Sequence, residues 1–260
     1  MRELIAMWRN TRMVVFTALT ASLYAAILIP FKVLPIIPGV TELRPANAIP
    51  VVCSFLFGPA AAWGAAIGNV IGDFFGGFGP GDLFGFVGNF LYGFLPYRTW
   101  ELLTQRRPVL RGPMDWLLFT AVVGLASGAC ALVIGWGLNV LGFVPFRVLG
   151  NIVWINNMLA SMLLAPFLLA VVYPRAERGG LTYGQVLGRR ETGRVGLAYV
   201  GLGLVVGAVG VGMWLGNGLS SGSVRVPWVG EGVAGGTGAW AVGLGLAPVL
   251  VVLLLGMVLL

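Results

Sequence analysis

Residues 38–73 read PGVTELRPANAIPVVCSFLFGPAAAWGAAIGNVIGD and set a charged, proline-rich loop directly against a very apolar segment of small residues. Glu42 and Arg44 lie two residues apart, and Asn47 follows them. Proline restricts the backbone at its own position and at the one before it, so this loop is stiff. In a chain with 10% charged residues, such side chains beside apolar segments predict a ligand contact. The alternative is an ordinary loop with a local ion pair.

Composition places the chain among membrane proteins. It has 260 residues, 58% of them hydrophobic, and a mean hydropathy of +0.93. Globular domains are about 45–50% apolar and about 25% charged. The apolar windows are long enough to cross a bilayer at about 20 residues each. We therefore predict an all-α polytopic membrane protein with about eight transmembrane helices, at residues 13–31, 46–57, 60–75, 83–97, 114–141, 151–173, 195–215 and 239–260.

Glycine and proline interrupt the second to fourth predicted spans. The interruptions fall at Gly58-Pro59 and in the stretch GGFGPGD at residues 76–82. Broken helices are tolerated at membrane depth only where protein or a water-filled cavity shields the freed backbone groups. The pattern therefore indicates that these segments lie against other helices or a cavity.

The basic residues favour one orientation. If the first span starts in the cytoplasm, twelve of the sixteen Lys and Arg residues are cytoplasmic, and Lys32, Arg44, Arg147 and Arg225 lie outside. Positive charge gathers on the cytoplasmic side of membrane proteins, so we expect both termini there. The net charge of +7 then reflects orientation in a lipid bilayer, and no nucleic-acid partner is expected.

Polar side chains of the predicted spans gather in their outer halves. Buried amides and carboxylates cost free energy unless they are hydrogen-bonded, so they should converge on one another. We expect an outward-facing cavity with a few donors and acceptors, which suits a small molecule. Hydrogen bonding between helices is the alternative for each asparagine. The outer-half residues are Asn69, Asp73, Asp82, Asn89, Asn139, Asn151, Asn156 and Asn157, and Trp154 among them is the expected stacking residue.

The first span carries small residues four apart, Ala21 and Ala25. Such a strip lets another helix approach closely, either from a partner or from this chain. Chemistry of other kinds has little support in the sequence. Histidine is absent, and Cys53 and Cys130 lie in apolar windows with no metal-ligand spacing, so neither a metal nor a cofactor is expected. With no paired carboxylates at one depth, an enzyme is disfavoured.

These residues resemble the substrate-binding S components of energy-coupling factor (ECF) transporters. The resemblance covers residues 11–173 and rests on the basic N-terminus, the Ala21/Ala25 strip, RPANAIPVV (residues 44–52) and LFGPAAAWGAAIGNVIGD (residues 56–73). It implies a prokaryotic plasma-membrane protein that binds a vitamin or similar micronutrient. It also implies a transmembrane coupling subunit, which Ala21 and Ala25 would face, and two cytoplasmic ATPases. The site it implies is Glu42, Arg44, Asn47, Asn89, Asn151, Trp154, Asn156 and Asn157, with Asn69, Asp73 and Asp82 as polar support.

The resemblance divides the chain into a six-span unit (residues 1–174), a basic cytoplasmic linker (175–194) and an additional C-terminal hairpin (195–260). The chain has no GxxxxGK[ST] phosphate loop, so ATP hydrolysis would come from partners. A binding subunit of an ATP-driven importer is the leading interpretation. The alternative is a stand-alone secondary transporter that uses Asp73 or Glu42 as an ion site.

Overall fold

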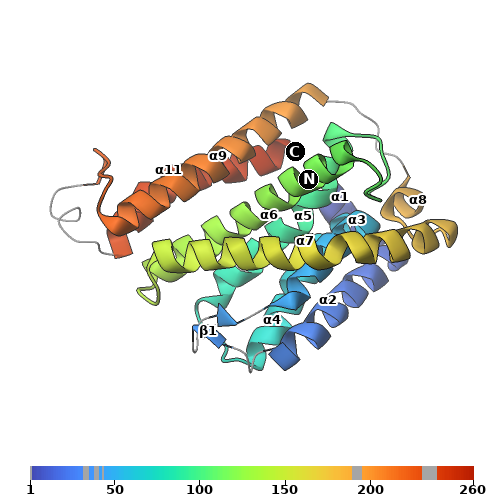
Figure 1. Ribbon diagram of the computed structural model, residues 1–260, viewed down its shortest axis with the longest axis horizontal. Helices are drawn as coiled ribbons and strands as arrows, with labels where there is room; N and C mark the ends of the chain where they lie inside the picture. The colour runs from blue at the N-terminus through green and yellow to red at the C-terminus, as the bar shows by residue number, and fades with distance from the viewer. Residues whose placement is uncertain (1, 32–34, 38–40, 43, 189–194, 230–238) are drawn as a thin grey trace.

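The computed structural model describes residues 2–31, 35–37, 41–42, 44–188, 195–229 and 239–260, which form a bundle of helices with one small β-hairpin (Figure 1). The strands pair antiparallel, with Pro35 opposite Glu42. The elements are α1 (Arg2–Ala6), η1 (Met7–Arg9), α2 (Thr11–Phe31), β1 (Pro35–Ile37), β2 (Thr41–Glu42), η2 (Pro45–Asn47), α3 (Ala48–Phe57), α4 (Pro59–Phe74), α5 (Asp82–Leu103), α6 (Pro113–Val140), α7 (Phe146–Arg178), α8 (Tyr183–Leu187), α9 (Val195–Ser221) and α11 (Ala239–Leu259).

Five helices of the described chain are long and apolar enough to cross a membrane, namely α2, α6, α7, α9 and α11. All eight predicted segments are helical. However, α3 and α4 have 10 and 16 residues, fewer than the about 20 needed for a hydrocarbon core of about 30 Å. The predicted all-helical membrane architecture is therefore confirmed, and the predicted count of eight spans is not.

The predicted break between α3 and α4 is confirmed at Gly58. Its φ is +52°, in the region where a side chain strains the backbone. The ring of Tyr183, from α8, lies over it, and a Cβ at Gly58 would be 2.7 Å from that ring. Glycine is thus required here both by the turn and by the packing of Tyr183 against it.

Helices α2 and α4 pack closely because α4 has a glycine at every fourth position. Cβ atoms at Gly64, Gly68 and Gly72 would collide with Thr20, Ala21 and Leu28 of α2, respectively. Without side chains at these three positions, the two helix backbones approach each other directly. The α2–α4 pair forms one side of the bundle.

This packing settles which small residues of α2 are accessible. Ala21 and Ala25 are each only 4% exposed, because they face the interior of this chain. Ala18, Ser22 and Ala26 are exposed, and they form a second four-residue strip on the outer face of α2. The accessible strip is therefore shifted by one residue from the Ala21/Ala25 strip.

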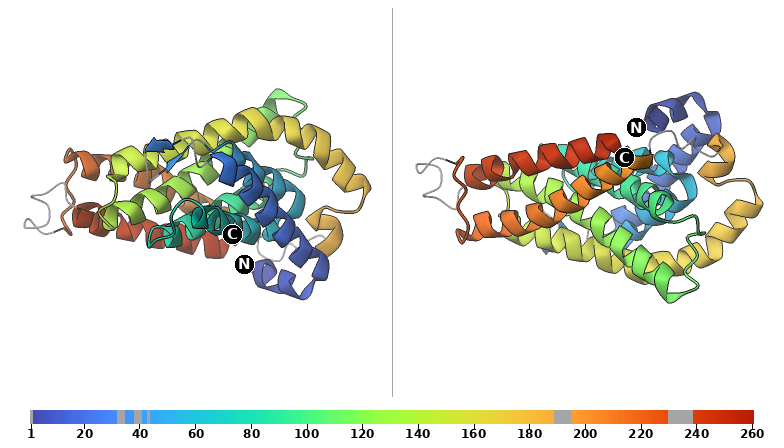
Figure 2. Two further views of the ribbon diagram at one scale, coloured as in Figure 1. Left: turned by 90° about the horizontal axis from the view of Figure 1, so that it is seen from below. Right: turned by 90° about the horizontal axis from the view of Figure 1, so that it is seen from above.

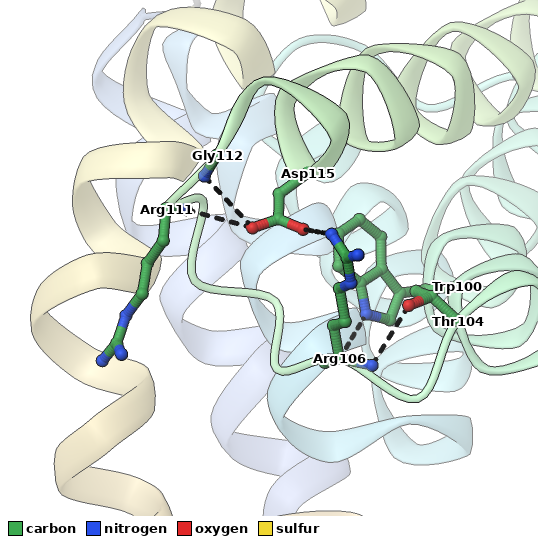
Figure 3. A network of polar contacts seen from close by, with 6 residues as sticks. All are labelled: Trp100, Thr104, Arg106, Arg111, Gly112 and Asp115. Atoms are coloured by element: carbon green, nitrogen blue, oxygen red, sulfur yellow. Dashed lines mark hydrogen bonds and ion pairs between the residues drawn. The ribbon is translucent and has the colours of Figure 1, made fainter.

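One end of the bundle, called here the basic end, carries the α5–α6 connection, α1 and α8. Figure 3 shows how Asp115 orders the α5–α6 connection. One carboxylate oxygen accepts a hydrogen bond of 2.9 Å from the guanidinium of Arg106, and the other accepts from the backbone N–H groups of Arg111 and Gly112. The indole of Trp100 donates to the Arg106 carbonyl at 2.8 Å. The opposite end, which carries β1 and β2, is called the loop end.

The C-terminal hairpin of α9 and α11 lies along α6, on the side away from α2 and α4 (Figures 1 and 2). Its two helices approach closely at Gly201 and Gly256, where a Cβ on either residue would lie within 3 Å of the other's carbonyl oxygen. The hairpin is thus packed against the rest of the bundle as an added layer.

Candidate binding site

A cavity of about 40 Å³ lies at the loop end, between η2, α5, α6 and α7. Its polar lining, called here the cavity cluster, consists of Arg44, Asn47, Asn89, Asn156 and Asn157. All five belong to the set expected from the sequence. The apolar wall is provided by α6 and α7 through Cys130, Ile134, Leu138, Leu149 and Val153.

Hydrogen bonds join the cavity cluster to α2. The side-chain amide of Asn47 donates to the amide oxygen of Asn157 at 2.5 Å. The hydroxyl of Tyr24, on α2, lies 2.8 Å from the amide oxygen of Asn47 and 3.0 Å from that of Asn89. The sequence reasoning missed Tyr24. Tyr24 is the one tyrosine of α2, but a single tyrosine in a largely apolar helix is equally typical of core packing.

Behind the cluster, two further hydroxyl groups bind the backbone carbonyls of Asn47 and Asn157. Ser161 Oγ donates to the Asn47 carbonyl at 3.2 Å, and the hydroxyl of Tyr92 donates to the Asn157 carbonyl at 3.1 Å. The two hydroxyl groups lie 2.5 Å apart. Tyr92 and Ser161 are fully buried, so this network holds η2 against α5 and α7.

The charged part of the site lies beside α4. The guanidinium of Arg44 donates to the amide oxygen of Asn69 at 3.1 Å, and the Asn69 amide donates to Asp73 at 2.6 Å. Gly85 makes room for this chain, because a Cβ there would lie 2.9 Å from the Asn69 nitrogen. Asn69 and Asp73 therefore lie next to the cavity cluster, as a layer behind Arg44.

The other expected site residues lie elsewhere. Trp154 is 39% exposed and donates through its indole to the carbonyl of Gly124 on α6, at 3.2 Å. Asp82 accepts from the backbone N–H of Gly79 at 2.6 Å, and so anchors the loop before α5. The backbone of Glu42 belongs to β2, and its side chain lies outside the described residues.

Asn151 belongs to a second group, called here the hairpin cluster, with Asn139 and Asn217. The amides of Asn151 and Asn217 are paired in both directions, at 2.7 and 3.3 Å. Asn139 accepts from the N–H of Phe146 at 2.8 Å and donates to the carbonyl of Ala239 at 3.2 Å. This cluster joins α6 and α7 to the C-terminal hairpin.

The cavity cluster presents hydrogen-bond donors and acceptors together. Each asparagine offers both a donor and an acceptor, and a guanidinium offers a planar fork of donors. Such hydrogen bonds are stronger in an apolar surrounding than in water. Across the described parts of the chain, no three His, Cys, Asp or Glu side chains come together as a metal site would require.

The described chain is thus an apolar helical bundle with five candidate membrane spans and a small polar cavity at one end. The model of the QueT transporter family matches residues 14–174 of this sequence. The chain therefore belongs to the QueT transporter family, which comprises ECF-transporter S components for a queuosine precursor. It is thus a membrane transporter S component for a micronutrient. No curated protein and no solved structure matches the chain.

Proposed function

We propose that this chain is the substrate-binding subunit of an ATP-driven importer and that it binds a deazaguanine precursor of queuosine in the cavity at the loop end. The observation that carries the proposal is the convergence of the cavity cluster from three separate stretches of the chain onto one small volume. These residues lie in a bundle whose core consists mainly of apolar side chains. A deazaguanine presents amide and amine groups along one edge, which suits asparagine side chains.

The cavity has to enlarge to accept such a ligand. A volume of about 40 Å³ holds roughly three water molecules. Ligand sites are usually several times larger. The hydrogen bond between Asn47 and Asn157 crosses the cavity cluster, so entry of a ring system requires these two side chains to separate. Ligand hydrogen bonds then replace the one that is lost.

We infer the orientation from the distribution of basic residues. The described Arg residues 98, 106, 107, 111, 175 and 178 belong to the basic end or the adjoining end of α7. We assign this end to the cytoplasm of a prokaryotic cell, together with both termini. The cavity then opens toward the outside, where a scavenged nutrient arrives.

Coupling to ATP hydrolysis requires partners, because the sequence has no phosphate-binding loop of its own. We assign the contact with the transmembrane coupling subunit to the exposed strip Ala18, Ser22 and Ala26 of α2. Ala21 and Ala25 lie behind this strip and shape the helix pair α2–α4. Two cytoplasmic ATPases complete the importer.

The test is a calorimetric titration of the purified protein with a deazaguanine precursor of queuosine, in the absence of ATP. We expect binding of one ligand, weakened by Arg44→Ala and retained in Arg147→Ala, which removes an exposed arginine at the same end. Equal affinity in both variants contradicts the proposed site. ATP-dependent uptake in cells that contain the ATPases, and none in cells that lack them, supports the importer over a secondary transporter.

A further inference from the structure

The C-terminal hairpin lies outside the region matched by the family, residues 14–174, and it packs on the two helices that form the apolar wall of the cavity. Figure 1 shows α9 and α11 running along α6, with α7 beside it. We propose that this hairpin holds the loop-end halves of α6 and α7 in the arrangement that ligand binding needs, with Asn217 as a positioning residue. The inference rests on the proposed function, because it assigns the hairpin a part in binding at the same cavity.

The two wall helices present different faces to the cavity and to the hairpin. Cavity-lining positions of α6 are Cys130, Ile134 and Leu138, and those that contact the hairpin include Leu132 and Trp136. On α7, Leu149 and Val153 line the cavity, whereas Arg147 and Asn151 contact the hairpin through hydrogen bonds. Residues two apart on a helix lie on nearly opposite faces. The hairpin therefore packs against the faces of α6 and α7 that lie opposite their cavity-lining faces.

The hairpin packs closely against the wall helices. A Cβ at Gly212 of α9 would lie 2.7 Å from Leu132, and one at Gly243 of α11 would lie 2.9 Å from Val140. A Cβ at Gly216 would collide with the ring of Phe146, the first residue of α7. Glycines at these positions bring the hairpin backbone directly against the wall helices, so a displacement of the wall is resisted along its length.

Hydrogen bonds also join the hairpin to the start of α7. Asn217 pairs with Asn151 in both directions and also donates to the Met213 carbonyl of its own helix, at 2.8 Å. Ser220 accepts from the backbone N–H of Arg147 at 3.2 Å. These bonds lie at the first turns of α7, just before Asn156 and Asn157 of the cavity cluster. They fix the rotation of α7 about its axis and its position along that axis. Both determine where the amides of Asn156 and Asn157 point.

A site that is already arranged binds its ligand more tightly, because less ordering is required on binding. Loss of one interhelical hydrogen bond in a membrane corresponds to about a threefold change in an equilibrium constant. We therefore expect Asn217→Leu to weaken deazaguanine binding about threefold. Asn151→Leu should do the same, and the double variant should be no worse than either, because both replacements remove the same interaction.

The experiment combines calorimetric titration of these variants with hydrogen exchange of the backbone amides in residues 146–157, measured on the full chain. The matched control is Trp214→Leu, one turn before Asn217 on α9, with a side chain that is 65% exposed. The inference predicts weaker binding and faster exchange at residues 146–157 in Asn217→Leu, and no change in Trp214→Leu. Ser220→Ala, which removes the partner of the Arg147 N–H, serves as the milder variant if Asn217→Leu does not fold.

The outcomes separate this inference from the proposed function. If the wild-type protein binds the deazaguanine and the Asn217 and Ser220 variants match it in affinity and exchange, the hairpin has no positioning role. Equal changes in the Trp214 control also contradict the inference. If the wild-type protein binds no deazaguanine, the proposed substrate is wrong, and the exchange of residues 146–157 alone still decides whether the hairpin holds α7.

Discussion

The cavity cluster and the hairpin cluster are both rich in asparagine and lie at the same end of the bundle, but they differ in what they face. The amides of Asn47 and Asn157 bond to each other across a cavity lined by Ile134 and Val153. The amides of Asn151 and Asn217 bond to each other between packed helices. A buried amide at a given depth therefore does not mark a binding site. The helix face it occupies decides whether it can exchange its partner for a ligand.

Asn157→Leu should have the largest effect on binding in this comparison. It removes a donor and an acceptor from the cavity and leaves the side-chain N–H group of Asn47 without its acceptor. Loss of such buried hydrogen bonds corresponds to about a thirtyfold loss of affinity for the deazaguanine. The matched change at the hairpin cluster, Asn151→Leu, should cost only about threefold. Equal losses in calorimetric titrations of the two variants would remove the distinction between the clusters.

Tyr24→Phe should have the next largest effect. The replacement keeps the ring packed in the core but removes the hydroxyl that lies between Asn47 and Asn89. The two amides then lose their common anchor on α2, and we expect about a fivefold loss of affinity. Tyr199→Phe is the control, because that hydroxyl bonds to the Leu102 carbonyl instead. An affinity equal to that of the wild type would show that the α2 contact does not support the site.

Substitution of the exposed strip should separate binding from transport. Ser22→Leu adds bulk to the outer face of α2, where the coupling subunit is proposed to dock. We expect ligand affinity within about twofold of the wild type and a loss of ATP-dependent uptake. Leu23→Ala, at an exposed neighbouring position, is the control for a general effect of the helix surface. Full uptake by Ser22→Leu argues against this docking face.

Trp154→Phe should have the smallest effect. The indole of Trp154 bonds to the Gly124 carbonyl across α6 and is not part of the cavity lining. We expect deazaguanine affinity to change less than about twofold, since this ring does not line the cavity. A large loss of affinity would extend the site to the far face of α7.

The sequence predicts much of the fold because its main signals are local. Apolar windows and the Gly58-Pro59 break identify the helical segments without knowledge of their neighbours. Which face of each helix is buried, by contrast, depends on the neighbouring helices. The order of Ala21, Ser22 and Ala25 does not reveal which strip faces inward until the glycines of α4 are placed against α2. For the same reason, Asn151 and Asn156 look equivalent in sequence although they face opposite sides of α7.

The candidate site follows the same pattern. Arg44, Asn47 and Asn157 could be expected from the sequence because polar residues in apolar spans are uncommon and conspicuous. Tyr24 could not, because a tyrosine in an apolar helix is compatible with ordinary core packing. The pairing of Asn151 with Asn217 depends on a contact between helices that are 66 positions apart in the chain, which no local pattern encodes.

The most direct test of the central claim uses the two cysteines of the chain. Both are buried, but Cys130 lines the cavity and Cys53 does not. In a Cys53→Ala protein, the rate at which a small methanethiosulfonate reagent labels Cys130 is measured by mass spectrometry at increasing concentrations of the deazaguanine. If the ligand occupies this cavity, a concentration ten times its dissociation constant should slow labelling about tenfold. Unchanged labelling of Cys130 at a concentration where calorimetry shows saturation would contradict the account.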